Sequence, residues 1–285
     1  MSEVDLHCHT TASDGALSPE ALVTRAARLG VKVVAITDHD SVEGVEAGLI
    51  AGSRAGIEVI PGIEINTDVP DAEVHVLGYY LDHTHPELLE ATARLRDGRV
   101  GRARRMADVL TGMGAPVDFH RILEIAGEGA VGRPHVAQAL LEAGHVSSYS
   151  EAFSRYIGRD SPAYVERSKF TPGEACALIR RAGGVPVFAH PVHFDRHGAI
   201  KSNVDLSKAL PELKAAGLMG IEAYYPGYDA VTVEHLLSLA RHYELLVTGG
   251  TDYHGGRPNE AEPGSTHVPS KAARRLRVAW EQLHA

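Results

Sequence analysis

Cysteine is scarce in this sequence, which has only Cys8 and Cys176 among 285 residues. Two thiols cannot build the disulfide framework of a small secreted domain, and reduced cysteines fit a cytoplasmic location. No apolar run approaches the roughly 20 residues that a membrane-spanning helix needs. The N-terminus, MSEVDLHCHT, is acidic and leads straight into a predicted strand, unlike a signal peptide. We therefore expect a cytoplasmic protein with no membrane partner.

Positive charge is also in deficit, because 28 lysines and arginines face 37 aspartates and glutamates, a formal net charge of −9. An acidic chain is a poor non-specific binder of nucleic acid, so we expect no double-stranded DNA partner. An anionic small molecule remains compatible, since bound divalent ions would reverse the local field. The sequence has neither a Walker phosphate-binding loop nor the G-x-S-x-G turn of serine hydrolases.

Strand and helix patterns alternate over the first 80 residues and again after residue 165. Ser18 and Pro19 open the first predicted helix, and Gly30 ends it. Alternating strands and helices predict a parallel sheet, and six or seven such units favour a barrel. Buried strands are predicted at 33–37, 58–61, 74–79 and 185–189, with further strands ending at Glu222 and Thr248.

The alternation is interrupted by a run of predicted helices at 86–113, 118–126, 133–143 and 149–157. This run reads as an insertion on a barrel loop. We therefore predict a barrel formed by residues 1–85 and 165–285, with residues 86–164 as a helical cap over the substrate.

Histidines and carboxylates gather where the predicted strands end, which is where α/β barrels carry their chemistry. His7 and His9 are two apart on a strand, so both should point to one side while Cys8 points into packing. Imidazole and carboxylate groups bind Zn, Mn or Fe, and so many together would be unstable without cations. The other strand-end groups are Asp14, Asp38, His39, Asp40, Glu64, His190, His193, Glu222, Asp252 and His254; His75 lies near the start of its strand.

The order of these motifs resembles the polymerase and histidinol phosphatase (PHP) family. The matching pieces are D-L-H-C-H-T with S-D-G, T-D-H-D, P-G-I-E-I, V-H-V-L-G, A-H-P and T-D-Y-H. The resemblance implies a distorted (β/α)7 barrel with an inserted α-helical domain and two or three divalent metal ions. It implies a first metal on His7, His9, Glu64 and Asp252, a second on Asp14, His39 and His254, and a third on Glu64, His75 and His190. Asp14 stands where other members have histidine, which favours Mn or Fe over Zn.

The helical insertion and the Gly-Arg-Pro-His motif resemble the nucleotide-directed members of this family. The resemblance implies a phosphoesterase that removes the 3′-phosphate of 3′,5′-nucleoside bisphosphates or trims short RNA from its 5′ end. We hypothesise that a hydroxide bridging two metals attacks phosphorus. His193 is a candidate to protonate the leaving alkoxide or to hold the phosphate; an exposed loop histidine is the alternative.

Two sets of residues in the insertion suggest a second anion site. Met106, Leu110 and Met113 recur at helical spacing, and the same buried stripe passes through Arg99 and Arg102. Buried guanidinium groups need anionic partners, so we predict a phosphate clamp. Arg133 and His135 open another helix, whose free amides suit a phosphate. Asp40 is a further candidate, for a sugar hydroxyl or a ligand imidazole.

Three other functions fit parts of the pattern. A phosphatase for histidinol phosphate or another small molecule would share the metal site. An amidohydrolase also begins from His-x-His in a barrel, but Asp14, Glu64 and the Asp252–His254 pair favour phosphoester chemistry. A non-catalytic metal-binding module is the third.

Overall fold

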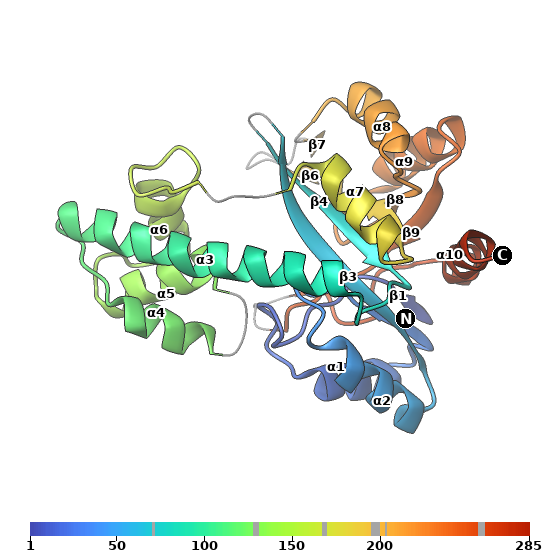
Figure 1. The fold of residues 1–285 in the computed structure, drawn as a ribbon, viewed down its shortest axis with the longest axis horizontal. Helices are drawn as coiled ribbons and strands as arrows, with labels where there is room; N and C mark the ends of the chain where they lie inside the picture. Colours follow the sequence, from blue (N-terminus) through green and yellow to red (C-terminus); the bar gives the residue numbers. More distant parts are fainter. Residues whose placement is uncertain (70–71, 128–130, 167–169, 195–199, 203, 256–259) are drawn as a thin grey trace. The chain divides into compact units, whose positions relative to one another are not determined.

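The computed structural model describes residues 1–69, 72–127, 131–166, 170–194, 200–202, 204–255 and 260–285 (Figure 1). The chain divides into two compact units, one formed by Met1–Glu90 with Lys169–Ala285 and the other by Ala91–Ser168. The first unit holds a mixed sheet with helices, and the second is helical. In the part of the chain described, no helix combines the length and apolar character that crossing a membrane would require.

The sheet of the first unit curls into a nearly closed barrel, which confirms the predicted fold class. Its first and last strands meet through hydrogen bonds from Leu6 N to Gly249 O (3.1 Å) and from His9 N to Tyr253 O (2.9 Å). In spatial order the seven strands are β1 (Val4–Asp5), β2 (Val33–Ile36), β3 (Glu58–Val69), β4 (Ala72–Tyr79), β5 (Val185–Phe188), β8 (Gly220–Tyr224) and β9 (Leu246–Gly249).

The expectation of a wholly parallel sheet is wrong at β4, which runs antiparallel to both β3 and β5. β3 is longer than predicted and pairs with β4 from Gly62↔Tyr79 to Val69↔Ala72. So short a connection leaves no room for the crossover helix that a parallel pair needs. Because β4 runs backwards, its first residues lie where the parallel strands end. The position of His75 early in its strand follows from this reversal.

The helices of the barrel unit bury one apolar face each. Ser18 caps α1, as predicted, by accepting a hydrogen bond from Ala21 N, and Thr171 and Glu174 form a reciprocal capping box on α7. Leu22 on α1 is fully buried, which contributes on the order of 1.5–3 kcal/mol. These helices are α1 (Pro19–Arg28), α2 (Val45–Ala55), α7 (Pro172–Arg181), α8 (Leu206–Ala215), α9 (Ala230–His242) and α10 (Ser270–Leu283).

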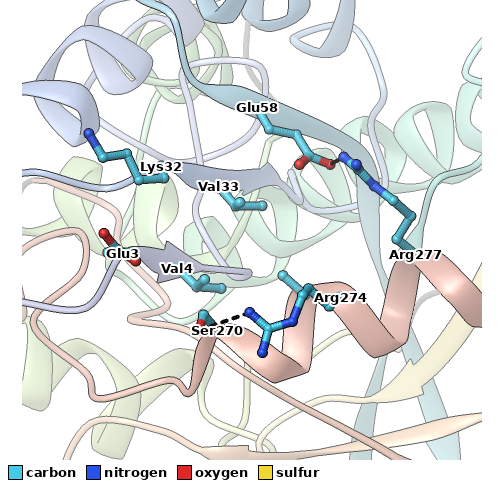
Figure 2. A pocket seen from close by; sticks show the side chains of 9 residues that line it. Glu3, Val4, Lys32, Val33, Glu58, Ser270, Arg274 and Arg277 are labelled. Carbon is cyan, nitrogen blue, oxygen red and sulfur yellow. Dashed lines mark hydrogen bonds and ion pairs between the residues drawn. The ribbon is translucent and has the colours of Figure 1, made fainter.

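The helix α10 lies beside the amino ends of β1 and β2 (Figure 2). Arg277 of α10 pairs with Glu58 at the start of β3, and Tyr80 donates a hydrogen bond of 2.8 Å to the same carboxylate. A pocket lined by Val4, Val33 and Arg274 opens there. It contains none of the predicted metal ligands, which belong to the opposite ends of the parallel strands.

The helical unit has its own core, formed by residues such as Met106, Leu110 and Ile122. The predicted buried stripe is confirmed at Met106 and Leu110 but wrong at Met113, which is 40 % exposed because the helix ends one residue earlier. The elements are α3 (Pro86–Gly112), α4 (Phe119–Ala126), α5 (Arg133–Glu142), α6 (Tyr149–Ala152) and the π-helical turn η1 (Phe153–Ile157).

Candidate metal centre

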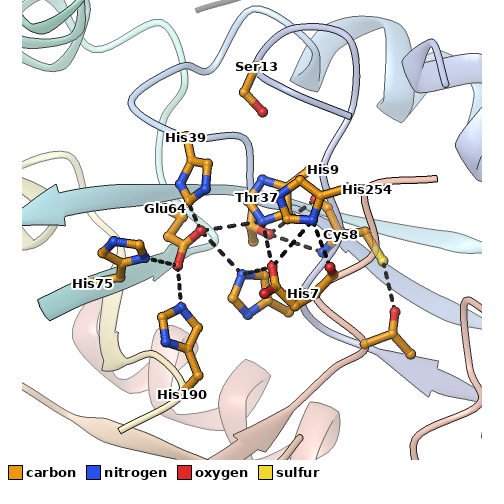
Figure 3. A network of polar contacts seen from close by, with 12 residues as sticks. His7, Cys8, His9, Ser13, Thr37, His39, Glu64, His75, His190 and His254 are labelled. Atoms are coloured by element: carbon orange, nitrogen blue, oxygen red, sulfur yellow. Dashed lines mark hydrogen bonds and ion pairs between the residues drawn. The ribbon is translucent and has the colours of Figure 1, made fainter. Parts of the chain in front are cut away.

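The barrel brings all nine predicted metal ligands into one cluster around Glu64. Figure 3 labels seven of them: His7, His9, His39, Glu64, His75, His190 and His254. The carboxylate of Glu64 lies 2.9 Å from Nδ1 of His39, which follows β2, and 2.9 Å from Nδ1 of His75 on β4. It also lies 3.0 Å from Nε2 of His190 and 3.3 Å from Nε2 of both His7 and His9. The remaining members, Asp14, Asp252 and His254, contact this set: His9 Nε2 is 3.0 Å from Asp252 Oδ1, and His254 Nε2 is 3.3 Å from Asp14 Oδ1.

Three groups of side chains within the cluster could each hold an ion, since their donor atoms all lie within 4.8 Å of one another. One group equals the first set that the family resemblance implies. The second contains one more histidine than implied, His9, and the third contains His39 where His190 was expected. The groups are His7, His9, Glu64 and Asp252; His9, Asp14, His39 and His254; and His39, Glu64 and His75.

The nitrogen and oxygen atoms of this cluster are better arranged to bind a cation than to form hydrogen bonds with one another. Buried atoms that form no hydrogen bond with any described residue include His7 Nε2, His9 Nδ1, Asp14 Oδ1 and Glu64 Oε2. Polar atoms buried without a partner are rare in proteins and call for an explanation. Imidazole nitrogens and carboxylate oxygens that converge in this way are suitable ligands for Zn, Mn or Fe.

The charges of the cluster depend strongly on one another. Burial disfavours the charged form of His7, but Glu222, Asp252 and Glu64 outweigh it and raise the pKa of His7 well above its usual value. Burial likewise opposes protonation of His9, whose pKa is nevertheless raised to about 10 by its contacts with the carboxylates of Asp252 and Glu64. The buried carboxylates therefore require positive charge, which protons or metal ions can supply.

The histidines in turn lower the pKa values of the buried carboxylates. Burial would raise the pKa of Glu64, but His39, His7 and His75 lower it well below the usual value. The pKa of Asp14 is lowered in the same way by His39 and His254. His39 differs from His7 and His9, because burial outweighs its carboxylate contacts and lowers its pKa. A neutral imidazole is the form that binds a metal.

The His7-Cys8-His9 segment follows a shorter strand than predicted, since β1 ends at Asp5. Cys8 is fully buried in the apolar cluster against α1 and pairs with Tyr253 in a parallel bridge, while the histidines on either side face Glu64. A Cβ at Gly250 would lie 2.4 Å from His7 N, so glycine is required for this close approach. His7 and His9 therefore point to one side and Cys8 to the other, as expected from the sequence, although all three residues follow the end of β1.

Asp40, expected to contact a sugar or an imidazole, is buried against β3. Its Oδ1 accepts a hydrogen bond of 2.9 Å from Asn66 N, and Oδ2 accepts one of 3.3 Å from Asn66 Nδ2. Asn66 Nδ2 also lies 3.1 Å from His39 Nδ1. Asn66 was not among the predicted site residues, although it lies two residues after Glu64 and so shares its face of β3.

A tyrosine is the second group that the sequence reading missed. The Tyr225 hydroxyl donates a hydrogen bond of 2.8 Å to Asp252 Oδ2. Such outer contacts orient metal ligands. His193 lies in the short strand β6 (His193–Phe194), and its side chain falls outside the described part of the structure.

The helical unit contains the four residues predicted to bind a phosphate. Arg102 is 9 % exposed, and its Nε donates a hydrogen bond of 2.6 Å to Val165 O. Its guanidinium carbon lies 5.1 Å from the centre of the Tyr164 ring. The guanidinium of Arg133 is 5.8 Å from the same ring. Arg99 is partly buried and lies close to Gly132 at the start of α5: a Cβ atom added to Gly132 would be 3.9 Å from Arg99 Nη1. His135 Nδ1 accepts a hydrogen bond of 2.9 Å from Gly132 N.

A distorted barrel with a buried His, Asp and Glu cluster at the carboxyl ends of its strands defines a metal-dependent hydrolase. The PHP domain model matches residues 5–156 of the chain. A 5′-3′ exoribonuclease of Haemophilus influenzae is 35 % identical over 250 residues, which cover 88 % of this chain and 89 % of the relative. A 3′,5′-nucleoside bisphosphate phosphatase of Chromobacterium violaceum is 28 % identical over 286 residues, 100 % of this chain and 98 % of the relative.

The solved structures agree with these relatives. A protein of Bifidobacterium adolescentis described as a metal-dependent phosphoesterase superposes with a TM-score of 0.83 at 33 % identity, covering 95 % of this chain and 94 % of that one. The chain belongs to the PHP domain family, and it is a metal-dependent phosphoesterase.

Proposed function

We propose that this phosphoesterase removes the 3′-phosphate from 3′,5′-nucleoside bisphosphates. The observation that carries the proposal is the gathering of guanidinium groups in the helical unit, in a chain whose full length aligns with a bisphosphate phosphatase. A mononucleotide with two phosphates needs one anion site for the reacting phosphate and another for the phosphate that stays.

The arginine cluster has the chemistry of a phosphate site. Arg102 and Arg133 approach the same aromatic ring, that of Tyr164, and Arg99 lies close to the start of α5. Guanidinium groups form paired, planar hydrogen bonds with phosphate oxygens, and the first amides of a helix favour an anion. The 5′-phosphate is the group that we assign to Arg99, Arg102, Arg133 and His135.

The barrel centre supplies the reaction itself. Divalent ions held by the nine ligands would neutralise phosphoryl charge and make water a stronger nucleophile at neutral pH. The chain contributes the positions of the ligands: Asn66 contacts His39, and Tyr225 holds the carboxylate of Asp252. His193, which follows Ala-His-Pro, remains our candidate for the proton donor to the leaving alkoxide.

Replacing two of the arginines should abolish the preference for substrates with two phosphates. In Arg99→Ala/Arg102→Ala, kcat/KM for adenosine 3′,5′-bisphosphate should fall at least about 100-fold, because hydrogen bonds to charged groups contribute about 1.5–3 kcal/mol each and about 1.4 kcal/mol is tenfold. kcat/KM for adenosine 3′-monophosphate should change little. Phosphate release measured on both substrates gives the ratio.

Arg104→Ala is the matched control, since Arg104 lies on the same helix but is exposed and packs its guanidinium on Phe119. It should keep the wild-type ratio. If the Arg99→Ala/Arg102→Ala variant also keeps the wild-type ratio, Arg99 and Arg102 do not bind the substrate. Wild-type activity confined to histidinol phosphate, or to amide substrates, would instead contradict the proposed function.

Short RNA is a second candidate substrate, favoured by the exoribonuclease relative at 35 % identity. A short oligoribonucleotide with a 5′-phosphate offers the same two phosphates at its first nucleotide as a 3′,5′-bisphosphate. Release of 5′-mononucleotides from such an oligomer would show that the same centre accepts a diester in place of the 3′-monoester.

A further inference from the structure

A fully buried carboxylate, Glu222, lies beneath the metal centre without belonging to any of the three ligand groups. It sits on β8, next to β5 and β9 in the barrel. Its Oε1 lies 3.1 Å from Nδ1 of His7, and its Oε2 accepts a hydrogen bond of 2.7 Å from the backbone N of His190. One side chain therefore connects two candidate ligands, His7 after β1 and His190 after β5.

The contact with His7 decides which ring nitrogen is available to a metal. A carboxylate can only accept, so Nδ1 of His7 carries the hydrogen of this bond. The other nitrogen, Nε2, then points to Glu64 and Asp252 at 3.3 Å each. Metal-binding histidines typically donate their second ring N–H to a carboxylate in this manner.

The contact with His190 acts on the backbone. His190 has φ of 23°, in the left-handed region that non-glycine residues rarely adopt. Such a conformation persists only where its surroundings enforce it. The bond to Glu222 holds this peptide, and the His190 ring then stacks against that of His7, with centroids 5.7 Å apart and planes 18° from parallel.

We propose that Glu222 is a positioning residue that orients His7 and His190 together and so sets the metal affinity of the centre. The inference rests on the metal-dependent function proposed above. This role uses both carboxylate oxygens of Glu222. Oε1 is the nearer acceptor for His7 Nδ1, at 3.1 Å against 3.3 Å for Oε2, while Oε2 accepts from His190 N at 2.7 Å.

Glu222→Gln separates this role from simple packing, because glutamine has nearly the same shape but one acceptor and one donor. If its oxygen faces His190 N, its NH₂ faces Nδ1 of His7 and moves the ring hydrogen to Nε2, the atom aimed at the metal. If its oxygen faces His7 instead, two donors meet at the strained His190 peptide. Either arrangement should weaken metal binding, whereas a packing role predicts no change.

The test is a titration of chelator-treated protein with Mn²⁺, and separately with Zn²⁺, followed by calorimetry. Glu222→Gln should bind each ion about 10–100-fold more weakly, the usual effect of removing an outer contact of a metal ligand. Glu222→Asp retains two acceptor oxygens and should recover part of the affinity, which also keeps the test decisive if the glutamine variant folds poorly.

Thr248→Val is the matched control. Thr248 is the partner of Glu222 in the β8–β9 register and is equally buried, so its replacement disturbs the same layer of the barrel. It should keep wild-type affinity for both ions. If Glu222→Gln binds as tightly as wild type, the positioning role is wrong while the metal centre stands. If the wild-type protein binds neither ion, the metal centre and this inference both fail.

Discussion

Glu64→Gln should abolish phosphoesterase activity, with kcat/KM reduced at least about 1,000-fold. Glu64 contacts five histidines and belongs to two of the three groups that could hold an ion. Lewis-acid stabilisation by metal ions contributes several kcal/mol, and about 4 kcal/mol corresponds to three powers of ten in rate. Steady-state phosphate release at saturating Mn²⁺ gives the ratio to wild type.

An exposed carboxylate provides the control for this variant. Glu262 pairs with Arg25 on the surface, so Glu262→Gln should retain wild-type activity. Far-UV circular dichroism of Glu64→Gln should match that of wild type, because glutamine preserves the volume of the side chain. A folded Glu64→Gln protein with more than a tenth of wild-type kcat/KM would show that Glu64 is not central to catalysis.

Removing divalent ions with a chelator should lower the melting temperature as well as the activity. The cluster gathers Asp14, Glu64, Glu222 and Asp252 in a buried site, where uncompensated like charges are unfavourable. An ion present at 100 times its Kd contributes about 2.7 kcal/mol per site. For a chain of this size that corresponds to roughly 5–10 °C in Tm. Differential scanning calorimetry before and after dialysis measures the shift.

Adding ions back distinguishes specific binding from general salt effects. Mn²⁺ should restore both the melting temperature and the activity at micromolar excess, whereas the same ionic strength of NaCl should restore neither. A melting temperature that stays constant through removal and readdition would mean that the cluster is stabilised by protons alone.

The barrel itself could be predicted because parallel strands and their helices leave local signals. Ser18 and Thr171 act as helix caps where the sequence places them, since capping depends on residues within one turn. The reversal of β4 could not be predicted in this way. It depends on the pairing of β3 with β4 over eight positions. The residues of a strand do not show whether it runs parallel or antiparallel to its neighbours.

The clustering of the candidate metal ligands could be predicted, because all of them except His75 follow a predicted strand or lie near its carboxyl end. Their assignment to individual groups could not: His9 and His39 each contact more than one group, and only three-dimensional distances show this. Tyr225 and Asn66 were missed for a similar reason. Each acts through a neighbour that is distant in sequence, as Tyr225 does through Asp252, 27 positions away.

The most direct test of the metal centre is a crystal structure with anomalous scattering data collected at the absorption edges of Mn, Fe and Zn. We expect at least two anomalous peaks within coordination distance of the nine candidate ligands, one of them beside the carboxylate of Glu64. No peak beside Glu64 in crystals grown with saturating metal, or peaks only elsewhere on the chain, would contradict it.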